Sequence, residues 1–176
     1  AVISLGGIVY SRSVRIGGDT MDTAIIQFMR KRYNLLIGES SAEMIKKEVG
    51  IAIGPKTGDG KTIDIKGRDL ASGVPKEIEL NQTQVAEALS EPIQHIVDSV
   101  KAALEETPPE LSADLVDMGI VLTGGGALLE KMDEAIRDAT GLPVTIAEEA
   151  LNCVALGSGK ALESERSFEP ILSSAY

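Results

Sequence analysis

The fold is decided by one stretch near the end of the chain, Ile120-Val121-Leu122-Thr123-Gly124-Gly125-Gly126-Ala127-Leu128-Leu129. The apolar run 120–123 indicates a buried strand, the glycines a turn, and a helix is predicted to follow directly from Leu128 to Thr140. Glycines without Cβ atoms let a ligand approach the backbone, and free amides at a helix start donate hydrogen bonds. The stretch therefore predicts either a ligand-binding turn or a tight strand-to-helix turn that binds nothing.

The segments after this stretch continue the same alternation. Gly141 and Pro143 stop the helix, residues 144–147 indicate another strand, and residues 151–163 indicate a final helix. This order of strand, glycine turn, helix, strand and helix predicts parallel strands with helices packed against them, an α/β fold. A dinucleotide-binding unit is excluded, because its fingerprint needs a glycine where this chain has Leu129.

The N-terminal segments predict a β-hairpin followed by a helix. Val2–Leu5 and Ile8–Ile16 flank Gly6-Gly7, a pair able to adopt the positive φ of a two-residue turn. From Asp19, the expected N-cap, apolar residues recur at helical spacing as far as Tyr33. This part of the chain is expected to belong to the same sheet domain as the glycine stretch.

The middle of the chain predicts a second, smaller unit. A helix over 41–49, closed by Gly50, is followed by a glycine-rich loop. The segments 62–66 and 76–80 then alternate strictly between apolar and polar residues, which is typical of two half-buried strands. The unit therefore combines a helix with a small hairpin.

A long helical stripe follows from Asn81 to about Leu104, where Pro92 predicts a kink or two consecutive helices. Pro108-Pro109 then starts a short helix that ends near Asp117. The predicted organisation is a larger sheet lobe with a smaller α+β outer lobe inserted in it. The larger lobe takes residues 1–39 and 106–163, the smaller one 40–105, and a tail 164–176.

Two pairs of charged residues could face a ligand, and each also has a purely structural explanation. Glu43 and Lys46 lie one turn apart on a helix, so a carboxylate and an ammonium could bracket a ribose and a base. Alternatively, Ser40 and Glu43 have the spacing of a capping box. Asp19 and Asp22 could face a phosphate or a metal, although an N-cap with a first-turn acid explains both.

Other apparent motifs are rejected. Gly58-Asp59-Gly60-Lys61-Thr62 resembles the end of a P-loop, but Pro55 stands where that motif needs glycine and a strand follows, so we expect a flexible loop. Cys153 lies among apolar neighbours and is expected in the core, and His95 is expected on a helix surface. The sequence indicates no nucleophile–base pair and no Cys/His metal site.

Composition narrows the function further. A hydrophobic content of 43% excludes intrinsic disorder, and 27 acidic against 17 basic residues give a net charge of −10, which repels nucleic acid. A single cysteine points to a reducing compartment, most simply the cytoplasm. No stretch approaches the roughly 20 apolar residues of a membrane helix, and the apolar start lacks the basic region of a secretory signal.

Several groups of residues together form a specific pattern: Ala1–Val9, Ser13–Asp19 with Asp22 and Ala24–Ile26, Asn34–Gly38, Ala42-Glu43 with Ile45-Lys46, Gly67–Leu70 with Gly73–Pro75, Thr107–Leu111, Gly119–Leu129, Cys153–Ala155 and Gly159–Leu162. This pattern resembles the MreB family of bacterial actin-like proteins over nearly all of residues 1–163. The resemblance implies the actin-like ATPase fold, which is ribonuclease H-like, with this chain as roughly its second half.

The resemblance also implies a nucleotide site. The residues that it assigns to nucleotide binding are Glu43, Lys46, Gly124, Gly125, Gly126 and Ala127. The first two are placed beside the adenine and ribose, and the glycine turn on the adenosine and α-phosphate side. The implied cofactor is ATP, with GTP as the alternative, together with Mg²⁺ in the full-length protein.

The implied parent is a filament-forming cytoskeletal protein that maintains rod cell shape by organising cell-wall synthesis at the cytoplasmic face of the inner membrane. Its implied partners are further copies of itself and inner-membrane cell-shape and cell-wall synthesis proteins, with membrane contact only through segments absent here. The family's phosphate-binding turns and magnesium-holding acids precede the first residue of this chain. We therefore expect a fragment that does not hydrolyse ATP alone. Two alternatives stay open, half of a phosphotransferase of the same superfamily and a nucleotide-independent adaptor.

Overall fold

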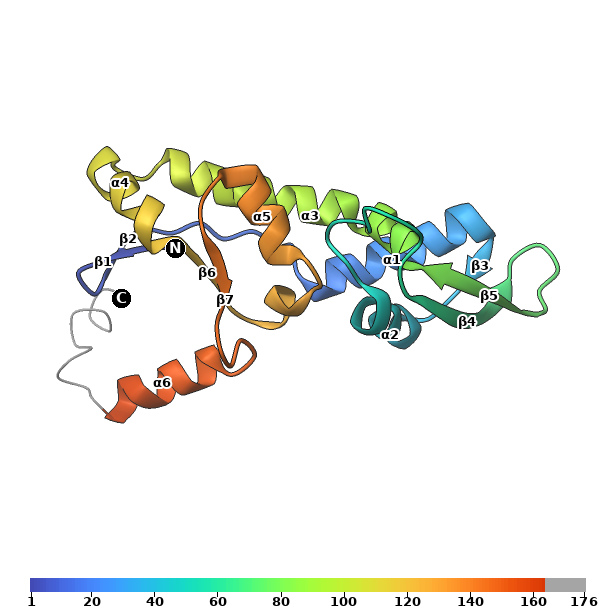
Figure 1. Ribbon diagram of the computed structural model, residues 1–176. Helices are drawn as coiled ribbons and strands as arrows, with labels where there is room; N and C mark the ends of the chain where they lie inside the picture. The colour runs from blue at the N-terminus through green and yellow to red at the C-terminus, as the bar shows by residue number, and fades with distance from the viewer. Residues whose placement is uncertain (164–176) are drawn as a thin grey trace.

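The computed structural model describes residues 1–163, and the predicted tail 164–176 lies outside the described residues. Its elements in chain order are β1 Val2–Ser4, β2 Gly7–Tyr10, α1 Gly18–Tyr33, β3 Leu35–Leu36, α2 Glu39–Val49, β4 Thr62–Asp69, β5 Pro75–Asn81, α3 Gln82–Glu105, α4 Pro109–Met118, β6 Ile120–Leu122, the 3₁₀ helix η1 Gly125–Leu128, α5 Met132–Thr140, β7 Val144–Ile146 and α6 Cys153–Glu163. Figure 1 shows an elongated molecule with β1, β2 and α4 toward one end and β3, β4 and β5 at the other. The mixed α/β character is as predicted.

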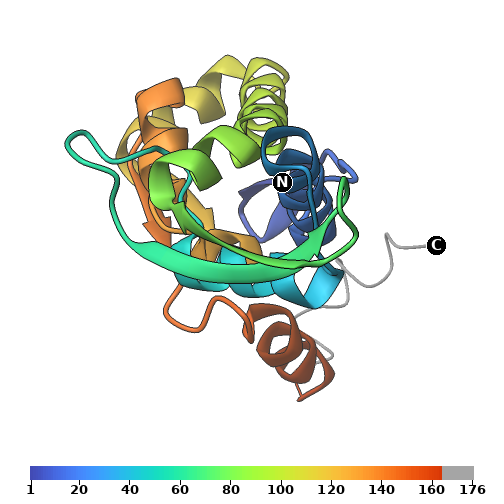
Figure 2. The same cartoon turned by 90° about the vertical axis from the view of Figure 1, so that its right-hand side faces the viewer.

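The hydrophobic core lies where α1, α2 and α3 pack on one another and on the antiparallel sheet β3-β4-β5. Met21, Ile25 and Met29 line up on the buried face of α1, as the helical spacing predicted, while Ile45 and Leu89 face them from α2 and α3. Figure 2 looks along the molecule from this end and shows the β4–β5 hairpin beside α2 and α3. The two predicted strands of this unit are confirmed, and both are longer than predicted.

The N-terminal hairpin is confirmed with a shifted turn and a shorter second strand. The positive φ values fall on Leu5 (+50°) and Gly6 (+78°), so the two-residue turn lies one position before Gly6-Gly7. The predicted second arm to Ile16 is wrong, because β2 ends at Tyr10. Tyr10 already faces the first residue of β1, and the rest of the segment has no strand left to pair with.

Two predicted helix caps are wrong. The N-cap of α1 is Gly17, so Asp19 is an acid of the first turn instead. The N-cap of α2 is Gly38, so Ser40 and Glu43 lie inside the helix and form no capping box. In both helices a glycine in extended backbone precedes the first turn and no side chain caps it, so the acidic side chains are free for other contacts.

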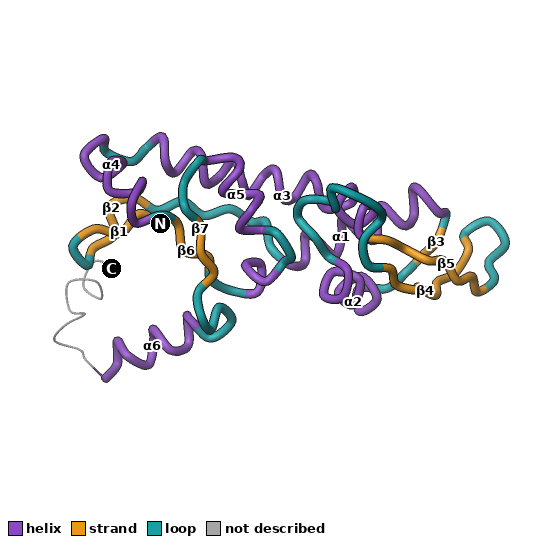
Figure 3. The backbone as a smooth tube through the Cα atoms, in the orientation of Figure 1, coloured by secondary structure: helices purple, strands orange, loops and turns teal. Residues whose placement is uncertain are grey.

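Helix α3 is a single helix of 24 residues, so the alternative of two consecutive helices is wrong. A capping box at Asn81 and Gln84 starts it, with both hydrogen bonds at 2.9–3.0 Å. The buried Pro92 removes only one backbone donor, and buried neighbours on the same face, Leu89 and Ile93, hold the helix in place. At 1.5 Å per residue α3 spans about 36 Å, and Figure 3 shows it running from β5 to α4.

In the last third, β6 and β7 pair in parallel as predicted, and Gly141 ends α5 in the left-handed conformation. Leu129, Met132 and Ile136 belong to the same buried cluster as α1–α3. The boundaries of the two predicted lobes stay a prediction.

Within residues 1–163, no helix has the length and apolar composition to cross a bilayer.

Helix α6 buries none of its residues, and neither does α4. Cys153 is therefore half-buried rather than a core residue, and that prediction is wrong. Its Sγ lies 3.4 Å from the Glu149 carbonyl oxygen. His95 is exposed on α3, as predicted.

Candidate functional site

A pocket of about 930 Å³ lies between α2 and the glycine turn. Its wall combines residues from segments that are far apart in the sequence, among them Glu43, Lys46, Lys61, Gly125, Gly126 and Glu130. The volume falls within the range of small-molecule and cofactor sites. The pocket is therefore the candidate functional site of the chain.

Four of the six predicted site residues lie in this wall. Glu43 and Lys46 reach it from α2, and Gly125 and Gly126 from the turn after β6. Both glycines are exposed, and a Cβ on Gly125 would touch only the side chain of Leu151, at 3.4 Å. The tertiary structure thus brings the helix pair and the glycine turn together, as the resemblance implied.

The other two predicted site residues, Gly124 and Ala127, shape the turn from behind. Gly124 has a φ of +79°, which favours glycine, and its N–H donates to the Ala150 carbonyl at 2.7 Å. Ala127 is buried, and its N–H donates to the Gly124 carbonyl at 3.2 Å. Neither residue lines the pocket.

The predicted helix start at Leu128 is wrong. Residues 125–128 form only the short helix η1, and α5 begins at Met132. Between them the backbone of Glu130 pairs with Ile51, and its carbonyl accepts a hydrogen bond from the Ala52 N–H at 2.8 Å. Because the chain leaves helical geometry to make this cross-connection, the N-terminus of α5 does not contribute amides to the pocket.

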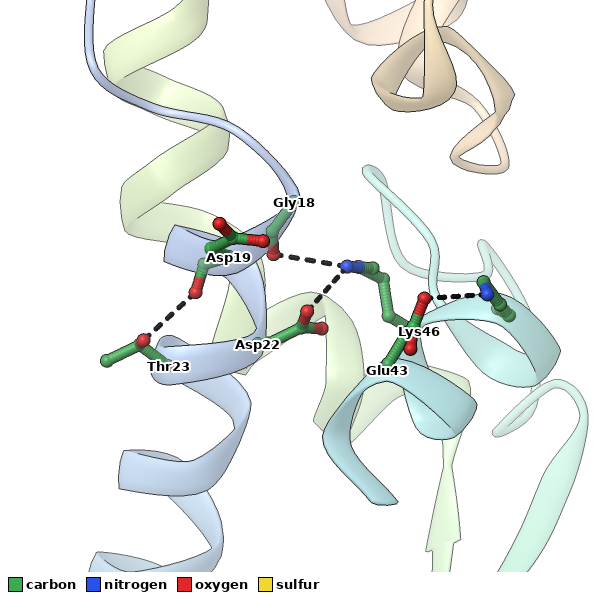
Figure 4. Close-up of polar contacts among 7 residues, drawn as sticks. Gly18, Asp19, Asp22, Thr23, Glu43 and Lys46 are labelled. Carbon is green, nitrogen blue, oxygen red and sulfur yellow. Dashed lines mark hydrogen bonds and ion pairs between the residues drawn. The ribbon is translucent and has the colours of Figure 1, made fainter. Parts of the chain in front are cut away.

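Lys46 is held at the pocket wall by α1. Its Nζ donates to Asp22 Oδ2 at 2.8 Å and to the Gly18 carbonyl at 3.1 Å (Figure 4). The Lys46 and Asp22 side chains are only 16% and 14% exposed, so this ion pair is largely shielded from water. Asp22 Oδ1 is buried and has no hydrogen-bond partner among the described residues. Asp22, which the sequence analysis explained as a first-turn acid of a helix, therefore orients Lys46 at the pocket.

Glu43 contacts Lys47 rather than Lys46. Glu43 Oε1 and Lys47 Nζ are 2.7 Å apart, at the i, i+4 spacing that favours such pairs. Both side chains are at least half exposed. The hydrogen bond from Lys47 holds the pKa of Glu43 below its ordinary value, so the group stays a carboxylate at the pocket rim.

Lys61 and Glu130 are site residues that the sequence did not reveal. Lys61 follows the glycine-rich loop, and the P-loop is correctly rejected because strand β4 comes next. Its Nζ nevertheless lies 2.9 Å from Glu130 Oε2 in the pocket wall. This contact lowers the pKa of Glu130 below its ordinary value. A lysine before one strand and a glutamate after a distant turn carry no shared sequence signal.

The chemistry that these side chains offer is binding. Lysine ammonium groups supply donors, carboxylates supply acceptors, and the glycine turn leaves room for a flat group. Among residues 1–163, no three His, Cys, Asp or Glu side chains gather closely enough to hold a metal ion. The arrangement suits a ligand that carries a ring and hydroxyl groups.

The sequence is similar to known cell-shape proteins along most of its length. A family model described as MreB/Mbl protein matches residues 1–170. The chain is 54% identical over 164 residues to the cell shape-determining protein MreB of Escherichia coli K12, covering 93% of this chain and 46% of that protein. It is 44% identical to the cell shape-determining protein Mbl of Bacillus subtilis 168, covering 93% of this chain and 49% of the relative.

Solved structures agree with the sequence comparison. MreB5 of Spiroplasma citri bound to AMPPNP matches with a TM-score of 0.85 and 35% identity, over 98% of this chain and 50% of that chain. A MamK double helical filament matches in fold alone, with a TM-score of 0.60 at 19% identity over 81% of this chain and 45% of that one. The predicted actin-like ATPase fold is confirmed.

Proposed function

The chain belongs to the MreB/Mbl family, and on that premise we propose that its pocket binds the adenosine side of ATP in a filament-forming protein that maintains rod cell shape. The chain spans about half the length of the relatives it matches. The activity of a whole family member is therefore part of the proposal. No observation on the described residues favours the phosphotransferase or the adaptor.

One observation carries the proposal: Lys46 and Gly125 line a single pocket, although they lie on separate elements far apart in the sequence. The Spiroplasma citri relative was crystallised with AMPPNP and also with ADP. A pocket of about 930 Å³ has room for an adenosine. Size, lining and family membership thus support the same ligand.

Each wall supplies a different contact. A lysine ammonium has three donors, and two of those on Lys46 go to Asp22 and Gly18, which leaves one for the ligand. Glu43 bonds Lys47 through one oxygen and keeps acceptor capacity for ribose hydroxyls. Gly125 and Gly126 leave their own part of the opposite wall without side chains, so a base can lie against the backbone there.

The phosphate end and the cellular setting rest on family membership alone. We propose ATP, with GTP as the competing nucleotide, and Mg²⁺ at its phosphates in the full-length protein. ATP hydrolysis is proposed for the whole family member and not for this chain by itself. The proposed location is the cytoplasm at the inner face of the membrane, where inner-membrane cell-shape proteins and cell-wall synthesis proteins would be partners.

Opposite charges at the two ends of the molecule support self-association. The end formed by α4 and the last turn of α3 carries the exposed acids Glu105, Glu106, Glu110, Asp114 and Asp117. The other end carries the exposed bases Arg30, Lys31, Arg32 and Arg68 (Figure 1). Within residues 1–163 none of these side chains takes part in an ion pair. A head-to-tail contact between such ends does not close and therefore grows filaments.

Equilibrium binding of labelled ATP tests the nucleotide site, first with this chain alone and then with the chain mixed with the remaining half of the E. coli relative. We expect binding in the mixture and competition by unlabelled ATP, with GTP as a second competitor. Binding in neither sample would favour the adaptor. ATP-dependent phosphate transfer to a small molecule would favour the phosphotransferase.

Two substitutions locate the ligand in the same assay. Gly125→Val places a branched side chain where the base approaches, so we expect weaker binding with the fold retained. Gly7→Val is its control, because Gly7 lies in strand β2, a Cβ there would meet no atom closer than 3.8 Å, and the residue has no place in the pocket. Glu43→Ala should also weaken binding. Unchanged affinity in both pocket variants would contradict the placement of the nucleotide.

Sedimentation at low and high salt tests the end contact. We expect faster sedimentation of the mixed sample at low salt, and a loss of this effect with Arg30→Glu and Arg32→Glu. Asp114→Arg combined with these two reversals should restore part of it. The control is Lys160→Glu on α6, an exposed base outside both sets of charged residues. Sedimentation that is unchanged by salt and by all of these charge reversals would disprove the proposed contact.

A further inference from the structure

Gln82 is a buried polar residue at the start of α3, and it has no role in the proposed ligand contacts. Its side chain is almost completely covered, with 4% exposure, and it does not line the pocket. Its Oε1 accepts the Lys61 backbone N–H at 3.1 Å, and its Nε2 donates to Glu130 Oε2 at 3.1 Å. One amide group therefore bonds to two residues of the pocket wall.

The two residues that Gln82 joins come from segments far apart in the sequence. Lys61 lies at the end of the loop after α2, whereas Glu130 follows the glycine turn. Two further connections meet at Glu130. Its side chain lies 2.9 Å from Lys61 Nζ, and its backbone forms a bridge with Ile51 in which its carbonyl accepts the Ala52 N–H at 2.8 Å. Glu130 thus connects the segment after α2 to the glycine wall, the part of the pocket lining that Gly125 and Gly126 form.

The loop is closed tightly around Gln82. Gly60 has a φ of +74°, and a Cβ there would lie 2.8 Å from both Gln82 Cβ and Pro55 Cγ. The Gln82 backbone N–H also donates to the Lys61 carbonyl at 3.0 Å. Because the amide is enclosed, water cannot easily replace its partners, and the loss of one partner leaves a buried polar group unsatisfied.

The exposed ion pair between Lys61 and Glu130 alone would connect the two segments only weakly. The Lys61 and Glu130 side chains are 65% and 41% exposed, and ion pairs between exposed groups contribute little and are screened by salt. The hydrogen bonds of the buried amide do not depend on salt in this way. Gln82 is therefore the member of the cluster that can hold the two walls at a fixed spacing.

We propose that Gln82 is a positioning residue for the pocket. Through Lys61 and Glu130 it fixes the spacing between the α2 wall and the glycine wall, so that nucleotide affinity depends on a side chain that does not touch the ligand. The statement about affinity rests on the proposed function, and the statement about spacing does not. The two statements can be tested separately in the same chain.

The spacing is measured by spin labels on exposed residues outside the pocket lining, with Met44→Cys on α2 and Asp138→Cys on α5 in a Cys153→Ser background. We expect one narrow distance distribution in the parent and a broader one after Gln82→Leu, which has similar volume but makes neither hydrogen bond. Glu130→Ala removes the shared acceptor and leaves α3 intact, so it should broaden the distribution as well. Unchanged distributions in both variants would overturn the proposal.

Gln94→Leu, on the exposed face of the same helix, is the matched control and should leave the distribution unchanged. Circular dichroism shows whether each variant is folded. If Gln82→Leu does not fold, Glu130→Ala alone decides the test. In the double variant the effects should be less than additive, because both substitutions remove the hydrogen bond from Gln82 Nε2 to Glu130 Oε2. Additive broadening would mean that Gln82 and Glu130 act independently, against the proposal.

ATP titration of the same variants, prepared without the spin labels, tests the effect on nucleotide affinity. We expect a dissociation constant about three- to tenfold higher after Gln82→Leu, the size of effect of one lost hydrogen bond. Gln94→Leu should bind as the parent does. A broadened spacing with unchanged affinity would overturn the positioning role. If the parent binds no ATP in this assay or in the mixture with the other half, the proposed function fails, and the distance measurement still decides whether Gln82 holds the walls.

Discussion

Helices α1, α2 and α3 bury their apolar faces, whereas the β1–β2 hairpin and α6 leave theirs open. Met29 and Ile45 are completely buried, while Leu5 is fully exposed and Leu162 is 76% exposed. Buried apolar area is the dominant stabilising contribution in a folded domain, and exposed apolar clusters mark contact surfaces. The comparison teaches that the packed helices determine the stability of the chain. The pocket is lined from α1, α2 and the glycine turn, and neither the hairpin nor α6 contributes to it.

The largest effect is expected from two leucine truncations in these two regions. Leu89→Ala removes a completely buried side chain from α3, so we expect the free energy of unfolding to fall by about 2–5 kcal/mol. Leu162→Ala removes an exposed side chain from α6 and should change it by less than about 0.5 kcal/mol. Urea unfolding followed by circular dichroism measures both. Equal losses would show that α6 is as well packed as α3.

A smaller effect is expected from two added methyl groups. A Cβ on Gly67 in β4 would lie 2.6 Å from the Leu36 carbonyl and 2.8 Å from Leu35 Cγ, so Gly67→Ala should cost about 1–3 kcal/mol. The nearest atom to a Cβ on Gly7 in β2 is the Ser4 carbonyl oxygen at 3.8 Å, so Gly7→Ala should be nearly neutral. Thermal unfolding compares the two variants. A Gly67→Ala variant as stable as the parent would mean that strands β3 and β4 pack less closely than these distances indicate.

Helix caps give the next effect. Asn81→Ala removes the capping box of α3 and should cost about 1 kcal/mol. Ser40→Ala, at the site of the cap that the sequence wrongly predicted, should cost almost nothing, because Gly38 precedes that helix. The same unfolding measurement separates them. A loss at Ser40 as large as that at Asn81 would restore the capping box.

The smallest effect concerns Glu130, an exposed residue of the pocket wall beside the packed region. Its pKa is lowered mainly by the hydrogen bond from Lys61. A carboxyl group with a lowered pKa in the folded state stabilises the fold above its unfolded pKa of about 4.3, and this contribution is lost as pH falls through the folded value. At pH 7 we expect Glu130→Gln to be less stable than the parent by under about 1 kcal/mol. The difference should shrink below pH 4 and in 1 M salt, and a constant difference would contradict the ion pair.

Much of the fold could be predicted because hydrophobic spacing directly reports which faces are buried. The helical stripes of α1 and α3, the alternation of β4 and β5 and the parallel pairing of β6 with β7 are all confirmed. The errors occur where a second signal competes. Asp19 and Ser40 are good capping residues, but each follows a glycine that caps the helix earlier. Cys153 has apolar neighbours in the sequence but lies on a helix that buries nothing.

The site could be predicted only in part. The glycine turn and the α2 pair were identified from local composition and from the family resemblance, and Gly125, Gly126, Glu43 and Lys46 do line one pocket. Their use in nucleotide binding stays a prediction. Lys61, Glu130 and the Asp22–Lys46 pair were missed, because an ion pair between distant segments leaves no periodicity or spacing to detect.

The sequence by itself determined the order of helices and strands, the α/β class and the family, since these depend on local patterns along the chain. Only the tertiary structure decided that Lys46 turns toward Asp22 and Glu43 toward Lys47, and that α5 begins after Glu130 has paired with Ile51. These choices depend on which side chains and amides meet across the pocket. Such contacts are determined by packing in three dimensions, where residues far apart in the sequence can satisfy each other's hydrogen bonds.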